Sequence, residues 1–97
     1  MLVLTLGIGL KDQAFYVRDT RVELADQISS LRFKLRVHQP AIIQEFWITD
    51  RNSIEIIPGV RCSAGHKANP GQVKVAIEAN PQIPIKRESL WNQDAKE

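Results

Sequence analysis

Basic and apolar side chains alternate along Leu31–His38, and this is the spacing in the chain best suited to binding chemistry. The basic members are Arg32, Lys34, Arg36 and His38. Successive side chains of a strand point to opposite faces, so in a strand these four would form one basic stripe. Such a stripe can contact phosphates, and we predict a secondary basic surface for nucleic acid here. The same pattern also fits the solvent-facing side of an ordinary amphipathic strand.

Side chains suited to catalysis or metal binding are sparse. His38 and His66 are far apart in the chain, and neither has a cysteine or carboxylate at ligand spacing, so we expect no metal site. The single cysteine, Cys62, can form no intrachain disulfide and is expected to be a buried or half-buried thiol. The chain carries neither a phosphate-binding glycine-rich loop with lysine nor a Gly-x-Ser-x-Gly motif. We therefore expect a protein that is not an enzyme and uses no cofactor.

The size and charge of the chain limit its class. Its 97 residues fit one domain with a modest core, to which dimerisation would add buried surface. The formal net charge is +2, which permits an anionic partner without requiring one. The apolar opening, residues 1–10, lacks a basic leading segment and is too short to span a bilayer. These features predict a cytoplasmic protein with no membrane association.

The hydrophobic pattern predicts a mainly β fold with short helices (α+β). The expected strands are Met1–Leu6, Ala14–Arg18, Leu31–Val37, Ser53–Ile57, Val60–Ser63, Gln72–Glu78 and Ile83–Arg87. We expect the first strand inside a sheet and the last at an edge, because Pro84 lacks an N–H. A short C-terminal helix is expected to begin at Glu88 and reach Trp91. No internal repeat is evident.

Two segments have patterns that fit more than one structure. Thr20 and Glu23 have the spacing of a helical capping box, which predicts a helix over about Arg21–Ser30. Further on, Pro40 suits the first turn of a helix. It precedes apolar residues spaced three and four apart, at Ile42, Ile43, Phe46 and Trp47. That spacing indicates a short helix over Pro40–Trp47, with a strand over Ile43–Thr49 as the competing interpretation.

Both ends of the chain resemble the carbon storage regulator (CsrA/RsmA) family. Met1-Leu2-Val3-Leu4-Thr5 and the later Ile8-Gly9 match the opening of that family. The block Gln72–Ala79 matches its Gln-Val-basic-apolar-small-apolar-x-Ala pattern. The block Ile83–Trp91 continues it with a short strand, an Arg-Glu pair and an aromatic residue in register. About a third of the chain is covered by this resemblance.

The resemblance implies a fold, a ligand and a site. Members are interlocked β-strand homodimers, so Met1–Leu6 of one chain would lie beside Ile83–Arg87 of the other. They bind GGA elements in hairpin loops of mRNA or small RNA and regulate translation. Loop bases expose their edges for such recognition. The RNA-binding residues implied here are Leu4, Thr5, Ala79, Asn80, Pro81, Lys86 and Arg87.

The chain also departs from the family pattern. Leu6 and Gly7 stand where members carry two basic residues, and Pro81 stands one place later than the family's proline. The middle is longer, which indicates an insertion within residues 19–70 of a single domain. An alternative hypothesis follows: a protein-interaction variant that no longer recognises GGA. It would act by heterodimerisation, or by binding another protein through the insert.

Overall fold

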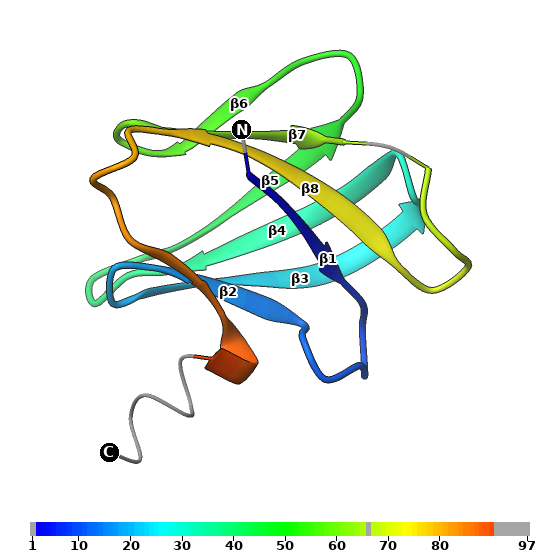
Figure 1. Cartoon of the computed structure of the whole chain (residues 1–97), viewed down its shortest axis with the longest axis horizontal. Coiled ribbons are helices and arrows are strands. Elements are labelled where there is room, and N and C mark those ends of the chain that lie inside the picture. The colour runs from blue at the N-terminus through cyan, green and yellow to red at the C-terminus, as the bar shows by residue number, and fades with distance from the viewer. Residues whose placement is uncertain (1, 66, 91–97) are drawn as a thin grey trace.

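A computed structural model describes residues 2–65 and 67–90 of the chain as two antiparallel β-sheets (Figure 1). The strands are β1 (Leu2–Leu6), β2 (Ala14–Val17), β3 (Thr20–Ser29), β4 (Arg32–His38), β5 (Ile43–Thr49), β6 (Ile54–Ile57), β7 (Val60–Ala64), β8 (Val73–Ala79) and β9 (Ile85–Arg87). One sheet has the order β1-β8-β7-β6, and the other has the order β5-β4-β3-β2-β9. The predicted mainly β fold is confirmed.

The two sheets enclose a single hydrophobic core between them. Phe33, Leu35 and Val37 of β4 are fully buried, as are Val73 and Val75 of β8. Alternate residues of a strand share a face, so each of these strands turns its apolar side toward the other sheet. Residues 19–70, within which an insertion was expected, contain β3 to β7 and contribute to this same core. The core therefore depends on the middle of the chain as much as on its ends.

The predicted helix over residues 21–30 is wrong, because this segment is the long strand β3. Val22 and Leu24 are buried two positions apart, which is the period of a strand. Ile28, which would face the core of a helical segment, is 62% exposed. Register shifts follow Leu24 and Gln27, so the apolar phase changes along the strand and produces an accidental helical spacing.

The competing interpretation of the next segment is confirmed, since Ile43–Thr49 is strand β5 and not a helix. It pairs along its whole length with β4, from His38↔Ile43 to Arg32↔Thr49. This pairing provides hydrogen-bond partners for the backbone groups on the edge of β4 that faces away from β3. A helix in place of β5 would leave those groups without ladder partners.

Predictions for the two ends had mixed outcomes. β1 was expected inside a sheet, but among the described residues it pairs only with β8 and lies at an edge. β9 lies at the edge of the other sheet, as predicted, and begins directly after Pro84. Residues 88–90 are helical, and Trp91 lies outside the described residues. Each sheet therefore has, at one of its edges, a short strand from near one end of the chain.

A structural repeat, not evident in the sequence, relates the two sheets. The β3–β4 pairs Arg21↔His38 and Leu24↔Leu35 recur in β7–β8 as Arg61↔Glu78 and Ala64↔Val75, with every number raised by 40. The units β2-β3-β4 and β6-β7-β8 are therefore equivalent, and β5 and β1 form the outer strand beside each. Among the described residues, only the sheet that contains β2-β3-β4 has a fifth strand, β9.

Candidate nucleic-acid interface

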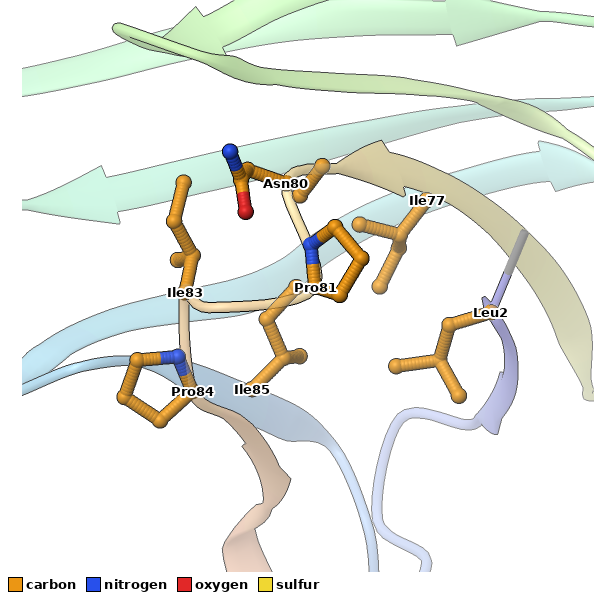
Figure 2. Close-up of a pocket in the computed structure, with 8 residues that line it drawn as sticks. Leu2, Ile77, Asn80, Pro81, Ile83, Pro84 and Ile85 are labelled. Atoms are coloured by element: carbon orange, nitrogen blue, oxygen red, sulfur yellow. The ribbon is translucent and has the colours of Figure 1, made fainter.

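The edge strands β1 and β9 border the same side of the molecule, where two hollows separate the sheets. Leu2 and Ile85, near the starts of the two strands, line one hollow of about 300 Å³ (Figure 2). Thr5 and Arg87, near their ends, line another of about 370 Å³. β1 and β9 do not pair with each other, so we call this region the open seam.

The first hollow of the open seam is lined mostly by apolar residues and is bordered by the segment that crosses between the sheets. Figure 2 shows Pro81, Ile83 and Pro84 of this segment around the side chain of Ile85. The turn is fixed by Asn80, whose Oδ1 accepts a hydrogen bond from Gln82 N at 2.9 Å. Its carbonyl oxygen accepts another from Ile83 N, also at 2.9 Å. One side-chain oxygen, one main-chain carbonyl oxygen and two main-chain amides are thus already used within the turn.

The second hollow combines polar and charged groups. It is lined by Thr5, Leu10, Lys11, Asp12, Gln72 and Arg87. Arg87 lies opposite Phe15 in the β2–β9 ladder, and directly opposed residues share a sheet face. Because Phe15 faces the core, Arg87 is directed to the inner side of its sheet, at the exposed seam. Lys11 adds a second cation that the sequence analysis did not single out.

Polar contacts hold β9 and the following turn in place. Arg21 Nη2 donates to Glu88 Oε2 at 2.9 Å, and Ser89 N donates to Asp12 Oδ1 at 3.0 Å. Before the strand, Arg18 N donates to the carbonyl oxygen of Pro84 at 2.9 Å. These contacts join segments distant in sequence and fix Arg87 between them.

The residues implied by the resemblance do not form one cluster. Leu4 is only 4% exposed, so it could offer a ligand main-chain groups alone, whereas Thr5 is exposed. Ala79, Asn80 and Pro81 line the apolar hollow, away from the hollow of Thr5 and Arg87. Lys86 is exposed and lies opposite Tyr16, on the outer side of the sheet. The seam therefore brings Thr5 and Arg87 together within one chain.

The predicted basic stripe exists, but acidic neighbours neutralise part of it. Arg36 Nη2 lies 2.8 Å from Glu45 Oε2, and Lys34 Nζ lies 3.8 Å from Glu45 Oε1. Arg36 Nη1 also lies 3.7 Å from Glu23 Oε1 on the neighbouring strand β3. The hydrogen bond from Arg36 is the main reason that the pKa of Glu45 is lowered. Of the three predicted arginines and lysines, only Arg32 has no carboxylate oxygen within 4 Å in residues 2–65 and 67–90, and it lies near Trp47.

Reactive groups are few in the described part of the chain. Cys62 is fully buried, as expected, and burial raises the pKa of its thiol to about 12. A thiol in this state is a poor nucleophile, because the thiolate is the reactive form. Residues 2–65 and 67–90 contain no group of three histidine, cysteine or acidic side chains that would hold a metal ion. His66 lies outside the described residues.

Comparison of the chain with protein-family models, curated proteins and solved structures finds no match. In the described residues, no helix is long and apolar enough to cross a membrane.

Proposed function

We propose that this chain binds RNA at the open seam and acts as a post-transcriptional regulator of translation. The ligand would be a GGA-type element in a hairpin loop of an mRNA or small RNA. The observation that carries the proposal is the hollow shared by Thr5 and Arg87. We place the activity in the cytoplasm, with no cofactor and no catalytic step.

The chemistry of the seam suits an unpaired guanine. An arginine guanidinium can donate two hydrogen bonds to the O6 and N7 of guanine, which is the commonest base-specific contact. Edge strands leave main-chain N–H and C=O groups without ladder partners, and β1 would offer these to base edges near Leu4 and Thr5. Lys11 would contact phosphate.

The missing basic pair has a structural explanation that is compatible with RNA binding. Leu6 is fully buried and Gly7 is buried, so neither position faces solvent in this chain. A charged side chain at residue 6 would carry a large desolvation cost. We infer that Lys11, which follows in the next loop, supplies the positive charge at this end of the seam.

The resemblance also predicts a homodimer, and this stays a prediction. Within one chain, β1 pairs with β8 and β9 pairs with β2, so the neighbours of both terminal strands are supplied internally. Light scattering of the purified chain across a range of concentrations would determine whether a second copy joins through the seam.

The experiment that tests the function compares Arg87→Ala with the parent chain in a gel shift with a GGA hairpin. Loss of one bidentate guanine contact is expected to weaken binding by about 5- to 150-fold, which corresponds to roughly 1–3 kcal/mol. Arg61→Ala is the matched control, because Arg61 is an exposed strand arginine outside the seam. Equal affinities of Arg87→Ala and the parent would refute the proposal, provided that circular dichroism shows both folded.

One observation favours a protein-interaction role as the second candidate. Among the described residues, β6 pairs only with β7, whereas the equivalent strand β2 also has β9 beside it. An unpaired edge can accept an extended segment of another protein. A chain that shifts no GGA hairpin but binds a strand-donating partner, or a second family member, would support this alternative.

A further inference from the structure

Trp47 forms a second exposed site on the outer face of the five-stranded sheet. It belongs to β5 and is 41% exposed, although β5 also contributes Ile48 to the core. A hollow of about 580 Å³ lies beside it, lined by Ser29, Leu31, Arg32, Trp47, Thr49, Asp50 and Arg51. An exposed indole beside a hollow of this kind is a surface on which a planar ligand can stack.

Two cations lie over the Trp47 ring. The guanidinium carbon of Arg32 is 5.8 Å from the ring centroid, and Lys34 Nζ is 5.4 Å from it. Both distances are in the range of cation–π attraction, which holds the ring beside β4. Lys34 also approaches Glu45, so its charge is shared, and Asp50 partly offsets Arg51 in the lining. Arg32 is therefore the main cation available for an anionic ligand.

The repeat relates two lining positions of this hollow to two of the charged hollow in the open seam. Lys34 pairs with Trp47 in one sheet, and Lys74 pairs with Thr5 in the other. Arg32 and Gln72, which differ by the same 40 positions, line the two hollows. The two sites are related by the fold but carry different side chains, with an aromatic ring only at the Trp47 position.

We propose that the Trp47 hollow binds a single-stranded nucleic acid segment without sequence preference. A base would stack on the Trp47 indole, and Arg32 and Arg51 would contact the adjacent phosphates. Aromatic stacking beside arginines is the usual way in which proteins hold unpaired bases regardless of their identity. The site extends the proposed RNA-binding function, but its residues are separate from the open seam, so each can fail alone.

The test uses the full chain and a fluorescein-labelled oligouridine of 12 nucleotides, which contains no guanine. Fluorescence anisotropy at low salt is expected to show saturable binding, weakened by at least about fivefold in Trp47→Ala. Trp47→Phe should restore part of the affinity, because a smaller ring still stacks. Arg32→Gln should weaken binding and reduce its salt dependence, whereas Arg32→Lys should retain more of both.

Ile43→Ala is the matched control, because Ile43 is exposed on the same face of β5, four residues before Trp47. It should bind oligouridine like the parent. Arg87→Ala should also leave oligouridine binding unchanged, even if it abolishes binding of the GGA hairpin. In a Trp91→Phe background, where Trp47 is the sole tryptophan, oligouridine should quench the intrinsic fluorescence.

The outcomes separate the two proposals. Loss of oligouridine affinity in Trp47→Ala but not in Ile43→Ala or Arg87→Ala supports the site. Absence of oligouridine binding by the parent, equal affinities of Trp47→Ala and the parent, or equal losses in Trp47→Ala and Ile43→Ala would overturn it. None of these results depends on whether the GGA hairpin binds at the seam.

Discussion

The two sheets of this protein share one register but differ at their borders. Four successive pairs of the β3–β4 ladder, from Arg21↔His38 to Leu24↔Leu35, recur in the β7–β8 ladder with a constant difference of 40 in numbering. At the borders, β5 packs against β6 and β7, whereas hollows separate β1 from β9. One side of the molecule is thus closed by contact, and the other is open.

The comparison indicates that the core is maintained in both halves, while the candidate binding groups lie where the halves differ. Buried positions stay apolar in both, as with Val22 and Cys62 or Val37 and Ile77. Exposed positions do not correspond in this way. Trp47 stands opposite Lys34, whereas Thr5 stands opposite Lys74. Differences between the halves, rather than their common features, therefore locate the surfaces available for ligands.

The largest expected effect tests whether the two sheets form one cooperative core. Phe33→Ala should lower the free energy of unfolding by about 3–5 kcal/mol, because Phe33 is fully buried. Val73→Ala, at the equivalent position, removes less volume and should cost roughly 2 kcal/mol. Urea unfolding followed by tryptophan fluorescence and by circular dichroism measures both, with Phe33→Leu as a milder variant. Two separate transitions would show that the sheets are independent.

An intermediate effect is expected where the two outer strands end. A Cβ added at Gly7 would lie 2.7 Å from the carbonyl oxygen of Gly71 and would overlap the side chain of Leu10. Gly7→Ala should therefore destabilise the fold by about 1–3 kcal/mol. The position equivalent to Gly7 in the other sheet is Thr49, which follows the buried Ile48 of β5, and the fold accommodates a side chain there.

Thr49→Ala is the control for the Gly7 variant. It removes the hydrogen bond of 3.3 Å that Arg51 N donates to Thr49 Oγ1, and it should lower the free energy of unfolding by about 1 kcal/mol or less in urea. If Gly7→Ala were as mild as Thr49→Ala, the ends of the two strands would not differ in packing as described here.

The smallest expected effect concerns Glu23, which has no acidic counterpart because Ser63 occupies the equivalent position. Burial alone would raise the pKa of Glu23, but hydrogen bonds and charges from His38 and Arg21 lower it overall. A carboxyl whose pKa is lowered in the folded state stabilises the fold above its unfolded pKa of about 4.3. This contribution is lost as the pH falls through the lower, folded pKa.

We expect this contribution to be under about 1 kcal/mol, because the ion pairs are partly exposed to solvent. Unfolding free energies measured from pH 6 down to pH 3 should fall less steeply for Glu23→Gln than for the parent. The parent and the variant should converge at the acidic end. If the unfolding free energy of both proteins falls with the same slope, the ion pairs of Glu23 with Arg21 and His38 contribute nothing to stability.

Sequence patterns predicted the strands with an unbroken alternation. β4 and β8 begin within one residue of their predicted starts, since one side of each contacts only the core. The patterns were misleading for β3, where shifts of register after Leu24 and Gln27 changed the phase. A local capping signal at Thr20 could not reveal that β2 and β4 flank this segment on both sides.

The candidate sites were predictable only in part. Arg87, Thr5 and Arg32 were identified, but Lys11 and the exposed ring of Trp47 were not. The apolar three-and-four spacing around Trp47 suggested a helix, and in a helix that ring would have been assigned to the core. The internal repeat escaped notice because side chains changed while backbone pairing was retained. Arg21 and Arg61, or Lys34 and Lys74, are identical, but such identities are few.

The repeat has a consequence for how this molecule can change over time. When a binding protein is assembled from identical subunits, any substitution is imposed on every copy of a surface at once. Here the two halves are encoded separately, and a mutation in one leaves the other untouched. One half can therefore keep an inherited role while its counterpart acquires a different one, with a shared interior restraining both.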